Sequence, residues 1–255
     1  MKIETYLSRI GYGGPFVATH EVLRGLQAAH LLSVPFENLD IVPLHRPIRL
    51  DEASLWEKLV IQRRGGFCYE LNGLFGGLLT AAGFDVTYLD ARVFRRDGSL
   101  GIDFDHLALL VRLPGDATTW LADVGFGDFS LEPLPLQEGE SAQGLRAYRL
   151  ESTSDGFVTW QRQYNGTWER QYFFDLKAHA FPAEYLHACE YHQRSPDSSF
   201  TRRAVISQAT KYGRITLEPE RLIVTDNGVR KETALKPNEW PLLLREHFGI
   251  VLPQT

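Results

Sequence analysis

Cysteine is scarce in this 255-residue sequence, and the patterns of a secreted or membrane-spanning chain are missing from it. The two cysteines, Cys68 and Cys189, lie far apart, so the fold is not expected to depend on a disulfide. Residues 1–5 lack the apolar stretch of a signal peptide, and the longest apolar-rich run, residues 71–84, is too short and glycine-interrupted to span a bilayer. We therefore expect a cytoplasmic protein without a membrane partner.

The sequence also lacks a strong excess of either positive or negative charge. The chain has 27 Lys and Arg against 32 Asp and Glu, both signs are interspersed, and the formal net charge is −5. This balance argues against nucleic acid as a partner, and a hydrophobic fraction of 44% is that of a globular protein. We expect a small-molecule ligand, bound by a monomer or a homodimer.

Metal-ligand and phosphate-loop motifs are also lacking. No His-Glu-x-x-His pattern occurs, and His187, Cys189 and His192 would not share one face of a helix. Gly125 and Gly127 are not part of a Gly-x-Gly-x-x-Gly or Lys-terminated pattern. The sequence therefore predicts no metal site and no phosphate-binding loop.

The apolar pattern divides the chain into three parts. Residues 1–84 have helical periodicity, and the third helix pattern ends at Gly83. Residues 85–182 contain six short strand patterns and the hairpin signal Asn165-Gly166, which favour an antiparallel barrel or sandwich. Residues 183–255 mix helix and strand patterns, with a last helix after Asn238. The sequence thus predicts an α+β fold with boundaries near 84 and 182.

Cys68 lies in Arg64-Gly65-Gly66-Phe67-Cys68-Tyr69-Glu70-Leu71-Asn72, where the third helix begins. A thiol at a helix start faces unpaired backbone N–H groups and the positive end of the helix dipole, which favour the thiolate. This placement predicts a nucleophile. A buried structural cysteine is the alternative, because free cysteine is often buried.

A base and its partner are predicted on the next two strands. His106 opens the strand pattern 106–113, and Asp123 lies near the end of the pattern 118–124. A hairpin that pairs Leu113 with Thr118 puts Ala108 opposite Asp123, so His106 and Asp123 share a face with Cα atoms about 7 to 8 Å apart. A bulge would reverse this parity, and a histidine bonded to a backbone carbonyl stays an alternative. Together with Cys68 they would form a papain-like triad of nucleophile, base and orienting carboxylate.

These motifs resemble those of the arylamine N-acetyltransferases. Besides residues 64–72, the resemblance rests on four segments in the same order: Val34-Pro35-Phe36-Glu37-Asn38-Leu39, Asp105-His106, Asp123-Val124-Gly125-Phe126-Gly127 and Ser195-Pro196-Asp197-Ser198-Ser199-Phe200. It implies an N-terminal helical bundle (residues 1–84), a central antiparallel β-barrel (85–182) and a C-terminal α/β lid (183–255). It also implies acetyl-CoA as acyl donor, and an arylamine, arylhydrazine or N-hydroxyarylamine as acceptor.

The resemblance implies roles for single residues too. Cys68 would carry the acetyl group, His106 would move its proton and Asp123 would orient His106. The acceptor pocket is expected to be lined by six residues: Phe36, Val93, Gly125, Phe126, Gly127 and Phe200. The CoA phosphates are expected to meet basic side chains of the lid: Arg202, Arg203, Lys211 and Arg214. Core packing for the aromatic residues and solvated surface for the basic ones are the alternatives.

Two other enzymes would use the same triad. An amide synthase that closes an ansamycin-type macrolactam would transfer a tethered acyl chain in place of acetyl. A cysteine hydrolase of the transglutaminase or papain type would deliver the acyl group to water, which a dry acceptor pocket argues against.

Overall fold

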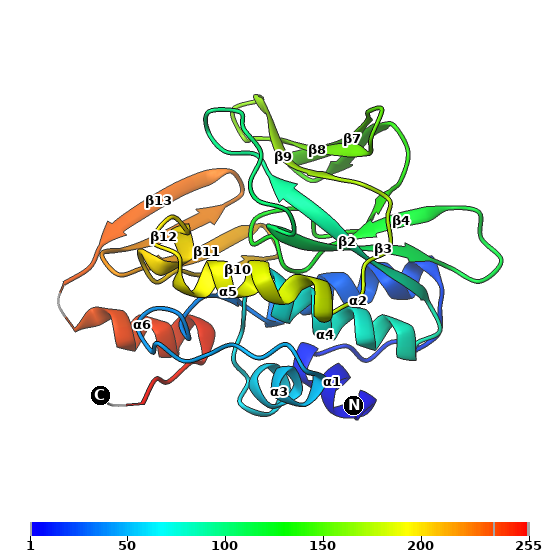
Figure 1. Ribbon diagram of the computed structural model, residues 1–255. Helices are drawn as coiled ribbons and strands as arrows, with labels where there is room; N and C mark the ends of the chain where they lie inside the picture. Colours follow the sequence, from blue (N-terminus) through cyan, green and yellow to red (C-terminus); the bar gives the residue numbers. More distant parts are fainter. Residues whose placement is uncertain (1, 237, 254–255) are drawn as a thin grey trace.

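The computed structural model describes residues 2–236 and 238–253, and in it six α-helices accompany two antiparallel sheets (Figure 1). Helix α3 continues directly into a π-helical turn, Glu57–Ile61. Two short 3₁₀ turns, Ala183–Tyr185 and Ser199–Thr201, flank α5. The α-helices are α1 (Ile3–Ile10), α2 (His20–Ser33), α3 (Glu52–Trp56), α4 (Cys68–Ala81), α5 (Leu186–Arg194) and α6 (Glu239–Phe248).

The helix starts and ends follow the capping residues in the sequence. The Thr19 side chain accepts a hydrogen bond from the Val22 N–H at the start of α2, and Asp51 does the same for Ser54 at the start of α3. Gly83, with φ at +94°, follows the end of α4. Most residues of α4 are buried on every side, so this helix is the core element that carries Cys68 into the interior.

The first sheet has eight strands in the order β5-β4-β3-β2-β9-β8-β7-β6 and curls into a nearly closed barrel. The six predicted strands are confirmed, and β5 and β6 are two short additions. The bounds are β2 (Asp85–Val93), β3 (His106–Arg112), β4 (Thr119–Ala122), β5 (Leu134–Pro135), β6 (Gly139–Gln143), β7 (Arg146–Ser152), β8 (Phe157–Arg162) and β9 (Trp168–Phe174).

Strand β3 is the wall between two hydrophobic cores. Its odd-numbered residues Leu107 and Leu109 pack into the core of the helical bundle, whereas Ala108 and Leu110 pack into the core of the barrel. Leu110 pairs with Leu121 of β4, which is the register predicted for the hairpin. By alternation, His106 belongs to the barrel side of this wall.

The second sheet joins the two ends of the chain. Its order is β1-β10-β11-β12-β13, and β1 comes from the N-terminal part. In α5, Ala188 and Cys189 pack into the core of the helical bundle, so residues from the third predicted part of the chain share a core with the first. The division of the chain into three domains stays a prediction. The bounds are β1 (Phe36–Glu37), β10 (Ile206–Thr210), β11 (Gly213–Glu218), β12 (Arg221–Asp226) and β13 (Val229–Ala234).

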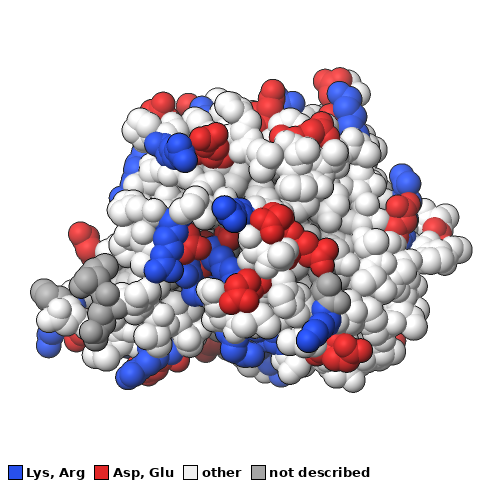
Figure 2. Space-filling view, turned by 60° about the horizontal axis from the view of Figure 1, so that its bottom comes forward, with Lys and Arg blue, Asp and Glu red and all other residues white. Residues whose placement is uncertain are grey.

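The surface carries both signs of charge. On the face shown in Figure 2, basic and acidic side chains intermingle around a hollow near the centre. Within residues 2–236 and 238–253, none of the helices combines the length and the apolar character needed to cross a membrane.

His30 makes the stability of the helical bundle depend on pH. It is buried against Tyr6 and Phe75, and burial, with a contribution from Arg9, lowers its pKa from 6.5 to about 3. Between these values the unfolded chain binds the proton and the folded chain does not, so stability falls as the pH is lowered. Between pH 7 and pH 5 this costs about 2 kcal/mol.

Between pH 7 and pH 5, we expect the His30→Gln variant to lose about 2 kcal/mol less unfolding free energy than the unsubstituted protein loses. Urea denaturation at the two pH values measures this difference. His187→Gln changes an exposed histidine of α5 and is the matched control. Identical slopes for the His30 variant and the unsubstituted protein would contradict the assignment.

Candidate functional site

The loop before Cys68 is held in one shape by close backbone packing. Gly66 forms a parallel bridge with Phe36, and a Cβ atom at Gly65 would collide with the Pro35 carbonyl oxygen, so only glycine fits at that position. The Glu70 carboxylate accepts a hydrogen bond from the Phe67 N–H at 3.1 Å. Cys68 is thereby placed as the first residue of α4.

Buried ion pairs support the same loop. Arg64 lies 2.7 Å from the Glu37 carboxylate and 3.3 Å from that of Asp40. Lys58 bridges Asp40 at 2.6 Å and Glu70 at 2.7 Å. Burial raises the pKa of Glu70 to about 7, although Lys58 opposes the shift.

His106 and Asp123 form a buried pair. The His106 Nε2 atom lies 2.8 Å from Asp123 Oδ2, and both residues are only 3% exposed. The Tyr172 hydroxyl donates to the same Asp123 oxygen, and the Gly125 N–H donates to the other. Burial raises the pKa of the Asp123 carboxyl, but His106, Asn72 and the Gly125 N–H outweigh it, and the pKa lies below its ordinary value.

Asn72 ties three elements together at this point. Its Nδ2 group donates to the Leu107 carbonyl at 2.6 Å and to Asp123 Oδ1 at 2.9 Å, and its Oδ1 accepts from the Val124 N–H. Asn72 lies one helical turn after Cys68, on the same face of an otherwise apolar helix. A polar side chain at that position was the signal in the sequence that could have identified Asn72 as part of the site. Tyr172, from β9, had no such signal in the sequence.

Cys68 meets the two strands at the same place. The Leu107 backbone makes a hydrogen bond to its sulfur, and a Cβ atom at Gly125 would lie 2.7 Å from the Cys68 Cα. Cys68 is therefore in contact with the residue after His106 and with the loop that follows Asp123. These contacts bring the three elements together, and the roles of the three residues stay a prediction.

The protonation of Cys68 differs from the expectation based on its position in the helix. Burial raises the pKa of the Cys68 thiol well above its ordinary value, the Leu107 hydrogen bond opposes this, and Asp105 and Asp123 add to it. The sequence pattern predicts a lower pKa because it shows the helix start but not that the site is dry. An isolated thiolate is disfavoured here, so the proton has to pass to a neighbouring base.

Five of the expected acceptor residues lie on two sides of this point. The Phe126 ring lies edge-on to the His106 ring at 5.2 Å, and Val93 pairs with Tyr172 across β2 and β9. On the other side, the Phe36 and Phe200 rings are 6.0 Å apart, and a Cβ at Gly127 would lie 3.7 Å from Phe36. The sixth, Gly125, lies against the Cys68 backbone.

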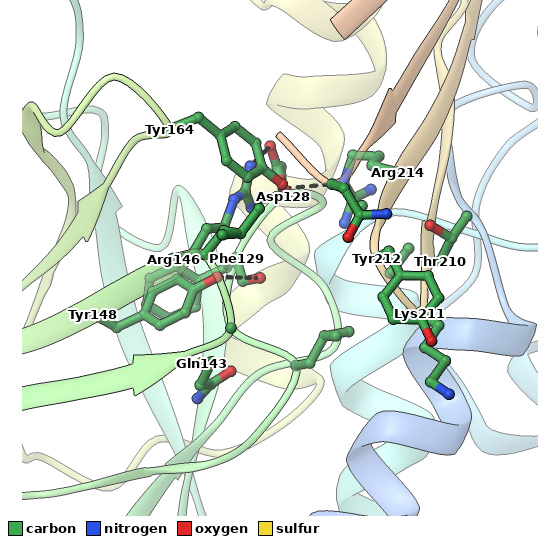
Figure 3. Close-up of a pocket in the computed structure, with 16 residues that line it drawn as sticks. Asp128, Phe129, Gln143, Arg146, Tyr148, Tyr164, Thr210, Lys211, Tyr212 and Arg214 are labelled. Atoms are coloured by element: carbon green, nitrogen blue, oxygen red, sulfur yellow. Dashed lines mark hydrogen bonds and ion pairs between the residues drawn. The ribbon is translucent and has the colours of Figure 1, made fainter. Parts of the chain in front are cut away.

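The four basic residues expected to contact CoA fall into two pairs. Lys211 and Arg214 line a cavity of about 150 Å³ between the barrel and the second sheet, with Asp128 and Tyr164 on its other side (Figure 3). Arg214 lies 3.1 Å from Asp128. Arg202 and Arg203 are exposed outside this cavity: Arg202 donates to backbone carbonyls and Arg203 pairs with Glu218.

Metal ligands are not gathered in the described part of the chain. Among these residues no three His, Cys, Asp or Glu side chains converge as a metal site would require. The groups present near Cys68 are its buried thiol and a histidine–carboxylate pair, which suit nucleophilic attack on an acyl group.

Comparison with known proteins agrees with this geometry. The family model described as N-acetyltransferase matches residues 19–255. The chain is 33% identical over 250 residues to the arylamine N-acetyltransferase of Escherichia coli (strain K12), covering 96% of this chain and 87% of that protein. It is 29% identical over 231 residues to proansamycin X synthase of Amycolatopsis mediterranei (strain S699), covering 89% of this chain and 88% of that protein.

A solved structure matches at the level of the fold. The Mycobacterium marinum arylamine N-acetyltransferase in complex with CoA superimposes with a TM-score of 0.90 at 31% sequence identity. The match covers 98% of this chain and 93% of that one.

We expect Asn72→Ala to lower the unfolding free energy by about 2 to 4 kcal/mol, because it removes the hydrogen bonds that the buried Leu107 carbonyl, Asp123 Oδ1 and Val124 N–H make with Asn72. Urea denaturation measures the loss. Thr80→Ala removes a half-buried hydrogen bond to Gly76 in the same helix and is the control, with an expected loss below about 1 kcal/mol. Equal losses would show that the Asn72 network is not special.

Proposed function

Because this chain belongs to the arylamine N-acetyltransferase family, we propose that it transfers the acetyl group of acetyl-CoA to arylamines, arylhydrazines or N-hydroxyarylamines. The observation that carries the proposal is that Cys68, at the start of α4, lies against the loop that follows Asp123, whose carboxylate is bonded to His106. Cys68 is the proposed nucleophile, His106 its proton partner and Asp123 the residue that orients His106.

The first half-reaction moves the acetyl group to Cys68. Asp123 occupies Nε2 of His106, which leaves Nδ1 as the nitrogen to take the thiol proton. The sulfur attacks the thioester carbonyl of acetyl-CoA, the bond between that carbon and the CoA sulfur breaks, and CoA leaves with the proton from His106. Backbone N–H groups at the start of α4, including that of Cys68, are suited to stabilise the oxyanion.

The second half-reaction returns the thiol. The amine nitrogen attacks the acetyl carbon, the bond to Cys68 sulfur breaks, and the amine proton passes through His106 to the released sulfur. An aromatic amine is largely neutral at pH 7 and can attack once it is positioned. A thiol carrier suits this exchange, because a thioester stays reactive toward an amine whereas a serine ester would be less so.

Apolar walls are proposed to hold the flat acceptor ring. Phe126 and Val93 would line one side and Phe36 and Phe200 the other, with Gly127 between them. Gly125, in turn, lets the loop after Asp123 approach Cys68. The dry surroundings of the thiol support transfer to an amine rather than to water.

The CoA phosphates are proposed to bind basic side chains of the second sheet. Lys211 and Arg214 share a cavity that also offers the rings of Tyr164 and Tyr212 for a nucleotide (Figure 3). Arg202 and Arg203 are candidates for the same role. Variants of Lys211 and Arg202 show which of the two pairs binds the phosphates.

A second candidate is an amide synthase that closes a macrolactam. It is favoured by the similarity to proansamycin X synthase along 89% of this chain. The triad chemistry would be the same, with the acyl group already tethered to the amine. Acetyl transfer from acetyl-CoA to a separate arylamine would distinguish the two.

We expect acetyl-CoA, added without amine, to leave one acetyl group on Cys68, detected by mass spectrometry of the intact protein and its peptides. Adding aniline should remove the group and yield acetanilide. Cys189→Ala should keep the adduct and Cys68→Ala should lose it. No adduct on the unsubstituted protein, or an unchanged adduct in Cys68→Ala, would overturn the proposed function.

We expect Lys211→Ala to raise the KM for acetyl-CoA about 5- to 10-fold while kcat stays close to that of the unsubstituted protein, because one charged contact to a phosphate is lost. Steady-state kinetics at several salt concentrations measure this, and added salt should narrow the difference. Arg202→Ala is the comparator from the other pair. A raised KM for Arg202→Ala alone would move the CoA phosphates to that pair.

A further inference from the structure

A second pairing of histidine and carboxylate lies beside the first. Asp105 precedes His106 in the chain, and its Oδ1 atom is 3.1 Å from Nε2 of His192, a buried residue of α5. Within the described residues no hydrogen bond of good geometry is completed at this Nε2, so the Asp105 carboxylate is the charge that faces it. Neither residue has a part in the acyl transfer described above.

The other oxygen of Asp105 reaches the barrel. Asp105 Oδ2 accepts a hydrogen bond from the Val93 N–H at 3.2 Å, at the end of β2. Val93 is one of the residues proposed to line the acceptor pocket. One carboxylate therefore fixes the backbone of an acceptor residue and at the same time faces the imidazole of His192.

The other nitrogen of His192 faces the segment that carries Phe200. Its Nδ1 atom is 3.1 Å from the Ser198 hydroxyl, and that hydroxyl accepts a hydrogen bond from the Phe200 N–H. The His192 ring also meets the Phe200 ring edge-on at 5.3 Å. Phe200 is the acceptor residue of the lid, and it packs on Phe36 and Phe67.

One tautomer of His192 is compatible with these contacts. Ser198 already accepts from the Phe200 N–H, so it can donate its own proton to His192 Nδ1, and Nε2 then carries a proton toward the Asp105 carboxylate, which can only accept. The chain of contacts runs from Val93 through Asp105, His192 and Ser198 to Phe200. Both of its ends lie on the proposed acceptor pocket, one on the barrel and one on the lid.

We propose that Asp105 and His192 are a positioning pair that sets the separation between Val93 and Phe200, and thereby selects which arylamines reach acetylated Cys68. This inference rests on the proposed function and adds a determinant of acceptor size. The contacts of His192 lead to Val93 and Phe200 and not to Cys68, so His192 acts on the second half-reaction, in which the amine is bound. A histidine that merely fills the core would affect both half-reactions through stability.

The test uses His192→Phe, which keeps an aromatic ring against Phe200 and removes both polar contacts. The first half-reaction is measured as the rate of Cys68 acetylation by acetyl-CoA without amine. The second is measured as the KM and kcat for aniline, which has one ring, and for 2-aminonaphthalene, which has two fused rings. His187→Gln, an exposed substitution in the same helix, is the control.

We expect the acetylation rate of His192→Phe to stay within twofold of that of the unsubstituted protein. The KM for aniline should rise at least fivefold, and the ratio of kcat/KM between the two amines should change at least threefold. Ser198→Ala, which removes the Nδ1 contact and the hydrogen-bond acceptor of the Phe200 N–H, should change the same two quantities in the same direction. Asp105→Asn, which keeps an oxygen for the Val93 N–H, should change them as His192→Phe does.

Equal losses in both half-reactions together with a lower melting temperature would overturn the positioning role, and so would unchanged amine kinetics. If His192→Phe does not fold, Ser198→Ala decides: an unchanged KM and amine ratio in that variant overturns the proposal. Failure of the proposed function is a separate result, because it would appear in the unsubstituted protein as the absence of an acetyl group on Cys68.

Discussion

A carboxylate that is removed from water must be surrounded by donors, and Asp123, 3% exposed, is surrounded on every side. His106 and the Tyr172 hydroxyl contact one oxygen, while Asn72 and the backbone of the following loop contact the other. These donors come from α4, β3, β9 and the loop after β4. Satisfying one buried charge thus brings together the elements that carry Cys68 and His106, the proposed nucleophile and its proposed base.

The same constraint explains why Cys68 is so closely enclosed. The loop that donates to Asp123 also brings Gly125 against the Cys68 backbone, where no side chain larger than hydrogen fits. On the opposite side, the ion pairs of Arg64 and Lys58 hold the residues before the helix. Buried pairs of this kind add little net stability but penalise any other arrangement strongly. The position of Cys68 is therefore determined by buried contacts of Asp123, Arg64 and Lys58, none of which involves the thiol itself.

Local patterns were sufficient to predict the pairing of His106 with Asp123 and most strands, but not what surrounds them. Strand alternation and hairpin length predicted that His106 and Asp123 share a face, and the observed pairing of Leu110 with Leu121 has that register. The partners Tyr172 and His192 come from distant segments, and no local period shows that they meet Asp123 and Asp105. The thiol pKa depends on burial by the whole fold, which a helix start does not reveal. The two-residue strand β1 was too short to leave a pattern.

That short strand gives the protein a constraint on its order of assembly. Phe36 pairs with Ser207 in the second sheet and bridges Gly66 in the loop before Cys68. A chain that emerges from the ribosome can form its helical bundle and most of its barrel early, yet β1 has no sheet to join until β10 has been made. The sheet contact of Phe36 is therefore completed only after β10 has been synthesised, late in the production of the chain.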